Sequence, residues 1–250
     1  MKKLPILTTA CHSSTFVPKE LRELMLLSDH EIIKQSDLYT DEIFHASNCH
    51  FLNGNISRLA ADLNRAPDHI EMEQQLVSEG VVVSISEENK PIYKEHPTLN
   101  QIIKRIEKYH NPFHTQIETY KKEEKIQFII DGHSLWSTPP AIYEENFTRA
   151  DINIGNRDYS SCTRVITHRI VEFFKSKGLS VAINKPYEGK YLLAAHCSRM
   201  GVNGVQVEFN RKLYMNEHTL ERNTEAITLY NSYIEELAKI IYQEFLTSTS

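Results

Sequence analysis

Short apolar runs alternate with longer segments of helical periodicity along this chain. Five runs rich in β-branched and aromatic residues predict strands. They cover residues 4–9, 81–85, 126–130, 179–183 and 204–209. The segments between and after them repeat apolar residues every three or four positions, which predicts helices. This alternation predicts an α/β fold, a mostly parallel mixed β-sheet with helices on both faces.

Local signals mark the early helices. Pro18 suits the first turn of a short helix. Ser36 is a favoured N-cap, so we expect a helix that begins there and carries Asp37 and Asp41.

Three longer helices follow. One is predicted over residues 98–122, where Pro112 must kink or break it. An amphipathic helix over residues 164–177 ends at Gly178, a good C-terminal signal. The last helix covers roughly residues 218–245.

Size and charge narrow the class of protein. With 250 residues and no repeat or low-complexity linker, residues 1–250 are predicted to form one domain. A net charge of −5 argues against a nucleic-acid surface, which needs clustered Lys and Arg. No apolar stretch approaches the ~18 residues of a membrane span, and none at the N-terminus is long enough for a signal peptide. The four cysteines have no CxxC spacing, which predicts reduced thiols in a cytoplasmic protein.

The tetrapeptide Asp131-Gly132-His133-Ser134 follows the strand predicted over residues 126–130. Ligands of open α/β sheets bind at the carboxyl ends of strands, and an Asp two residues before a His can hold its ring. His12 follows the first predicted strand in the same way. Alone, the tetrapeptide is weak evidence, and His12 is better explained as a capping or surface residue. Two at adjacent strand ends favour a metal site, and zinc suits such ligands.

A catalytic zinc usually takes a third protein ligand and leaves one position open. Asp37 and Asp41 are four residues apart and would share one face of the predicted helix. Each is equally well explained as a carboxylate that stabilises the start of that helix.

Glu208 lies in the predicted strand over residues 204–209, where it and Gln206 alternate with apolar residues. A Glu within so apolar a strand is costly unless it is paired or functional. Beside zinc it would be the general base of amide hydrolysis. The alternative is an edge strand whose Glu faces solvent.

A cluster of polar residues offers candidates for binding an anionic substrate. Asn64 and Arg65 are adjacent, and Arg58 precedes them. Arg binds carboxylates through two parallel hydrogen bonds, although a salt bridge with a nearby Asp explains it equally well. Asn156-Arg157 and Asn184-Lys185-Pro186-Tyr187 are weaker polar loops that could line the same cleft.

Eight such segments occur in one order between about residue 5 and residue 217. They are Cys11-His12-Ser13-Ser14, Asp37 to Asp41, Asp62-Leu63-Asn64-Arg65, Tyr109 with His110 or His114, Asp131-Gly132-His133-Ser134, Asn153-Ile154-Gly155, Asn184 to Gly189, and Gln206-Val207-Glu208. In this order they resemble the N-formylglutamate amidohydrolase family, which is related in fold to zinc carboxypeptidases.

The resemblance implies a zinc ion held by His12, His133 and an acidic residue. It also implies that Glu208 is the general base and that Arg65 holds a substrate carboxylate. The chain departs from the pattern at Ser14, where the family has Gly.

A second departure concerns the acidic ligand. Carboxypeptidases take it from a His-x-x-Glu motif, but the residue three after His12 is Thr15. The ligand must therefore come from elsewhere, and we prefer Asp37 to Asp41.

The resulting hypothesis is a zinc-dependent hydrolase of a small anionic N-acyl amino acid, most simply N-formyl-L-glutamate, although other divalent ions also suit these ligands. Arg58 would assist Arg65, and His114 or Arg157 would stabilise the oxyanion. One alternative is a carboxypeptidase or amidase on acidic or cell-wall peptides. Another is a catalytically silent relative that binds a small anion or a protein partner.

Overall fold

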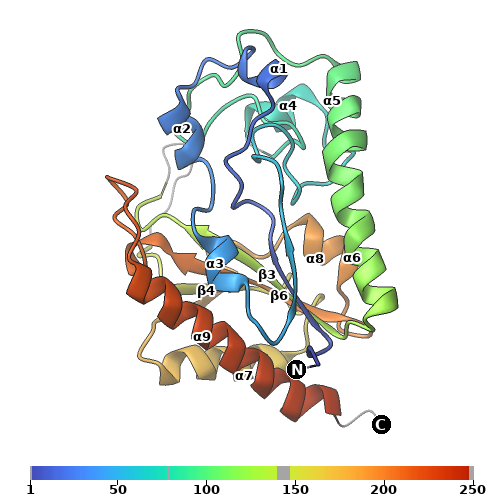
Figure 1. Cartoon of the computed structure of the whole chain (residues 1–250), viewed down its shortest axis with the longest axis vertical. Helices are drawn as coiled ribbons and strands as arrows, with labels where there is room; N and C mark the ends of the chain where they lie inside the picture. Colours follow the sequence, from blue (N-terminus) through green and yellow to red (C-terminus); the bar gives the residue numbers. More distant parts are fainter. Residues whose placement is uncertain (1, 78, 140–146, 248–250) are drawn as a thin grey trace.

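A six-stranded β-sheet forms the centre of the computed structural model, which describes residues 2–77, 79–139 and 147–247 (Figure 1). The strands are β1 (Ile6–Ala10), β2 (His50–Asn53), β3 (Phe128–Leu135), β4 (Ile152–Gly155), β5 (Val181–Ile183) and β6 (Asn203–Asn210). Their order is β2-β1-β3-β6-β4-β5. Only the pairing of β4 with β6 is antiparallel. The predicted fold class, a single α/β domain with a mostly parallel mixed sheet, is confirmed.

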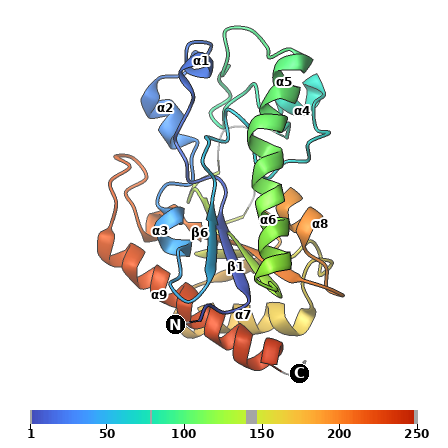
Figure 2. The same ribbon diagram turned by 45° about the vertical axis from the view of Figure 1, so that its right-hand side comes forward.

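Helices cover both faces of this sheet (Figures 1 and 2). The helical segments are α1 (Lys19–Arg22), α2 (Asp29–Lys34), α3 (Thr40–Phe44), α4 (Met72–Leu76), α5 (Leu99–Arg105), the π-helix η1 (Ile106–His110), α6 (Asn111–Glu123), α7 (Arg164–Ser176), α8 (Tyr191–His196), the 3-10 helix η2 (Arg211–Leu213), α9 (Thr224–Ile241) and the π-helix η3 (Tyr242–Leu246). Residues of α3, α7 and α9 form one apolar cluster with the sheet, and residues of α6 and α8 form another with its opposite face.

A third apolar cluster lies apart from the sheet, among α2, α5 and the loops that connect them. It includes Val81, Val82 and Val83, which are buried without forming a strand. The strand predicted over residues 81–85 is therefore wrong, and only an isolated bridge joins Ile85 to Pro91. An apolar run indicates that a segment is buried, and a packed loop buries its side chains as well as a strand does.

Two further predictions concern helix starts. Tyr39 has a left-handed backbone (φ 65°) and α3 begins only at Thr40, so Ser36 is not its N-cap and Asp37 lies in the preceding loop. The last helix begins at Thr224, where the Asn223 side chain accepts a hydrogen bond from the Ala226 amide. Its predicted start at about residue 218 is therefore too early. The strands β2 and β4, four residues each, were not predicted.

The helix predicted over residues 98–122 is confirmed as one run of α5, η1 and α6. Thr98 forms a capping box with Gln101 at its start. Pro112 lies in the first turn of α6, directly after the π-helix. Since Pro has no N–H to donate to the preceding turn, the wider π turn accommodates it without ending the helix.

Gly132 allows the close packing of α3 on the sheet, and we expect Gly132→Ala to be destabilising. A Cβ atom at this position would overlap the Phe44 ring of α3. Overpacking of this kind costs about 1–3 kcal/mol. Thermal and denaturant unfolding would measure the loss. Gly201→Ala is the matched control because nothing lies within 4 Å of its added methyl group; equal stability of the two variants would contradict the prediction.

Candidate active site

One face of the sheet changes from apolar to polar along β1, β3 and β6. Leu7 and Ile129 pack against α6 and α8 on this face. Further along the same strands, the polar side chains register in pairs across the sheet. They are Thr9 beside Asp131, Asp131 beside Gln206, and His133 beside Glu208. The polar tetrapeptide thus lies inside β3 and not beyond its end, because β6 pairs with β3 as far as Leu135.

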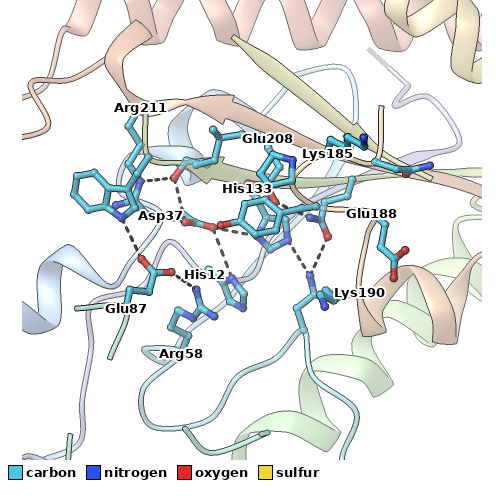
Figure 3. A pocket seen from close by; sticks show the side chains of 18 of the residues that line it. His12, Asp37, Arg58, Glu87, His133, Lys185, Glu188, Lys190, Glu208 and Arg211 are labelled. Carbon is cyan, nitrogen blue, oxygen red and sulfur yellow. Dashed lines mark hydrogen bonds and ion pairs between the residues drawn. The ribbon is translucent and has the colours of Figure 1, made fainter. Parts of the chain in front are cut away.

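A pocket of about 510 Å³ opens where these polar residues lie. Five cationic and five acidic side chains line its described part. They are Arg58, Arg65, Lys185, Lys190 and Arg211, with Asp37, Glu79, Glu87, Glu188 and Glu208. Figure 3 shows His12, Asp37 and His133 directed toward one another in this pocket.

The two histidines share one carboxylate and each has a second of its own. His12 Nε2 lies 2.7 Å from Asp62 Oδ1. His133 Nε2 lies 3.0 Å from Asp131 Oδ2. Both Nδ1 atoms face Asp37 Oδ2, at 3.7 Å from His12 and 3.0 Å from His133. An Nε2–H that is donated to a carboxylate leaves the Nδ1 lone pair free for a metal, as in metal-binding histidines generally.

Electrostatics keep the cluster ionised. Burial opposes charge on His12, but Asp62, Cys11 and Asp37 together outweigh it and raise the pKa of the imidazole well above its ordinary value. Burial is likewise outweighed at His133, where Asp131 raises the pKa. At Asp37, burial is outweighed by hydrogen bonds with both imidazoles, and its pKa falls well below the ordinary value. A metal ion would replace the protons that these imidazoles hold.

A cysteine offers a second donor set. Cys11, His12 and His133 place ligand atoms within 4.8 Å of one another, so they could hold a metal ion. Cys11 Sγ lies 3.7 Å from His133 Nε2, on the ring edge opposite Asp37. Cys11 is fully buried in the apolar cluster and does not line the pocket. The Asp37 set is therefore the one that opens to the pocket.

The loop before α3 brings Asp37, and not Asp41, into the pocket. The Asp37 amide donates to the His12 carbonyl at 2.9 Å, which ties this loop to the end of β1. Asp41 lies on α3 and is not among the residues that line the pocket.

Glu208 lies in the middle of the sheet, since β6 runs between β3 and β4. The edge-strand alternative is therefore wrong. The residue is 4% exposed, and its side chain accepts a hydrogen bond from Gln206 Nε2 at 2.6 Å. Burial raises the pKa of this carboxyl to about 8. Glu208 thus faces the pocket as a buried acid in register with His133.

Asn64 and the two arginines that were predicted to bind substrate also line the pocket. Asn64 Nδ2 donates to Asp131 Oδ2 at 3.2 Å, which ties its loop to β3. Arg58 bridges Asp62 at 3.1 Å and Glu87 at 3.5 Å. Arg65 lies 3.4 Å from a Glu79 oxygen, and Lys190 shares that carboxylate.

His114 and Arg157 are not among the pocket-lining residues. His114 Nε2 contacts the Leu63 carbonyl at 2.9 Å, while Nδ1 lies 2.7 Å from His196 Nε2. Arg157 has φ of 50° and donates to the Gly189 carbonyl at 3.3 Å. Both support loops that border the pocket.

Sequence reasoning did not find Arg211 or Trp136, although both line the pocket. Arg211 directly follows β6, and Trp136 directly follows β3. Both residues lie just beyond the end of a strand that carries a candidate residue, and this position is the sequence signal that could have found them. The loop from Asn184 to Tyr187, a weaker candidate, does border the pocket, held by hydrogen bonds with Asn153.

A family model described as N-formylglutamate amidohydrolase matches residues 4–215. The chain belongs to this family. The chain is similar to the crystal structure of N-formylglutamate amidohydrolase from Ralstonia eutropha JMP134, with 23% identity and a TM-score of 0.86. The match covers all of this chain and 96% of that one. It is also similar to the crystal structure of a gene product from Agrobacterium tumefaciens, with 18% identity and a TM-score of 0.72. That match covers 96% of this chain and 91% of the other. At these identities the likeness shows the fold alone. No curated protein matches the chain.

Membership in the N-formylglutamate amidohydrolase family makes the chain an amidohydrolase. The match ends at residue 215, before α9, although α9 packs into the same apolar cluster as β3 and β6. The assignment of residues 1–250 to one such domain stays a prediction. Within the described ranges, no helix is long and apolar enough to cross a membrane.

The imidazole of His114 should make the protein sensitive to acid. Burial, with His110 and His196 nearby, lowers its pKa to about 3. The unfolded chain takes up this proton near pH 6.5, so stability falls as the pH drops below that value. We expect wild type to lose about 2 kcal/mol more than His114→Gln between about pH 7 and about pH 5.

Urea unfolding at several pH values would measure this difference. His30→Gln, an exposed change on α2, is the control and should keep the wild-type pH dependence. Parallel pH curves for wild type and His114→Gln would contradict the prediction.

Proposed function

We propose that this family member is a zinc-dependent hydrolase that converts N-formyl-L-glutamate to glutamate and formate. The observation that carries the proposal is the shared carboxylate oxygen of Asp37, which faces Nδ1 of both His12 and His133. Each imidazole has a carboxylate on its other nitrogen, the arrangement that orients histidines toward a metal.

His12, Asp37 and His133 would hold the ion, and two imidazoles with one carboxylate suit zinc. The chemistry that zinc supplies when bound is that of a Lewis acid, which acidifies water and polarises a carbonyl. Asp62 and Asp131 would keep both Nε2 protons in place and so fix the tautomers.

Glu208 would take the proton of the attacking water and deliver it to the departing amine. A base must be ionised, whereas burial, with the nearby carboxylates of Asp37 and Asp131, raises the pKa of this carboxyl to about 8. A divalent cation in the same pocket favours the ionised form. The hydrogen bond from Gln206 would aim the carboxylate.

The charges of the pocket suit a substrate with two carboxylates. Among the residues that the structure describes, its cationic and acidic side chains are equal in number, so a divalent ion gives this part of the pocket a formal surplus of two positive charges. N-formyl-L-glutamate carries two negative charges. Arg65, Arg58 and Asn64 would orient it, with Arg65 best placed because its partner Glu79 is also neutralised by Lys190.

A second candidate is an amidase or carboxypeptidase that acts on longer acidic peptides. A further pocket of about 250 Å³ shares Glu87 and Trp136 with the main one, which leaves room beyond a small substrate. Comparison of kcat/KM for N-formyl-L-glutamate and for short acidic peptides would separate the two. The cytoplasmic location inferred from the cysteines stays a prediction.

Glu208→Gln should lower kcat about 10²–10⁴-fold because the general base is lost. Formate release from N-formyl-L-glutamate measures this loss, and emission spectroscopy should find the metal content unchanged. Glu225→Gln on α9 is the control for the chemical change. A metal-replete Glu208→Gln protein with full activity would remove Glu208 from the mechanism.

Arg65→Met should raise KM about 10–100-fold and change kcat less, because a charge-assisted hydrogen bond to the substrate is lost. N-formyl-L-glutamine, which lacks the side-chain carboxylate, tests which substrate carboxylate Arg65 binds. If Arg65 binds the side-chain carboxylate, the variant and wild type should have similar KM for this analogue. Arg222→Met, which removes a surface ion pair with Glu42, is the control. An unchanged KM for N-formyl-L-glutamate would contradict the role of Arg65.

A further inference from the structure

Arg211 is buried beside the proposed metal ligands and makes contacts with all three of its guanidinium nitrogens. Its side chain is 3% exposed. Nη2 donates to Asp37 Oδ1 at 3.0 Å, and Nε donates to Ser134 Oγ at 3.0 Å. Nη1 donates to the Lys34 carbonyl at 3.2 Å. The guanidinium lies 4.1 Å from the centre of the Trp136 ring (Figure 3 labels Arg211). These contacts fix both the plane and the position of the group.

The two carboxylate oxygens of Asp37 have different hydrogen-bond partners. Oδ1 accepts from Arg211 and also from Ser134 Oγ at 3.1 Å. Oδ2 faces the imidazoles of His12 and His133. A carboxylate without such restraint can rotate and offer either oxygen or both. Two donors on Oδ1 therefore determine which oxygen faces the histidines.

We propose that Arg211 is a positioning residue that, with Ser134, holds the Asp37 carboxylate so that only Oδ2 is offered as a metal ligand. This inference rests on the proposed function, since it requires the metal between His12 and His133. Arg211 also lines the pocket, but three of its five N–H groups donate to acceptors of the protein, one of them an oxygen of Asp37.

The geometry explains why the residue is Arg. A planar guanidinium reaches three acceptors at once and stacks on an aromatic ring, whereas the Lys ammonium is a point charge on a flexible stem. The positive charge also favours the ionised form of Asp37, which a metal requires. Arg211→Lys should therefore retain the charge and lose the orientation.

The test is the zinc affinity of the full chain, measured by competition with a chromophoric chelator at constant pH. We expect Arg211→Met to weaken zinc binding about 10–100-fold, the usual effect of removing a partner of a metal ligand. Arg211→Lys and Ser134→Ala should cause smaller losses. In the cobalt-substituted protein, all three variants should shift the visible absorption bands, which report how the ligands are arranged. Arg169→Met, which removes the surface ion pair with Glu244, should leave affinity and spectrum unchanged.

The outcomes separate the inference from the function on which it rests. If wild type takes up no zinc, the proposed function fails and the inference with it. If wild type binds zinc while Arg211→Met and Ser134→Ala keep its affinity and its cobalt spectrum, the inference alone is overturned. A purely structural role predicts a lower Tm with unchanged affinity for each folded molecule. Should Arg211→Met not fold, Ser134→Ala decides, because it removes only one hydroxyl.

Discussion

The site depends on the interactions of one buried group, the Asp37 carboxylate. The Asp37 side chain is 5% exposed, and an isolated charge at such a depth would be very costly. Its amide reaches the His12 carbonyl, Oδ2 faces both imidazoles, and Oδ1 accepts from Ser134 and Arg211. Because these partners come from the turn after β1, from β3 and from η2 directly after β6, one buried charge joins the ends of the three strands at the pocket.

The sheet makes this concentration of charge feasible. Helices α6 and α8 cover the first part of one sheet face with apolar contacts, and the last part of the same face borders the pocket. Within that part, hydrogen bonds pass from Asn64 to Gln206 and from Gln206 to Glu208. Buried polar groups are tolerated when they are hydrogen-bonded in this way. On the opposite face, α3, α7 and α9 pack against apolar side chains of β3, β4 and β6.

Loops far from the sheet complete the pocket, and histidines of η1 and α6 support one of them. His114 of α6 contacts the Leu63 carbonyl and His110 of η1 contacts the Arg65 carbonyl, so these two helices fix the segment that carries Asn64 and Arg65. His114, whose pKa burial lowers, is therefore a structural support beside the pocket. Such a residue must stay uncharged to keep its place, because protonation would bury an added charge.

The ordered polar motifs and the apolar alternation of β6 were enough to predict the family, the α/β class and the histidines later found together. These signals are local: because side chains alternate between the two faces of a strand, Glu208 and Val207 lie on opposite faces whatever the rest of the chain does. Packing decided what local signals cannot. It buried Val81 to Val83 without a strand, chose Asp37 over Asp41 for the pocket, and turned His114 and Arg157 toward backbone carbonyls. It also brought Arg211 onto Asp37 across 174 residues of sequence, a contact that no periodicity can report because it depends on which strands pair.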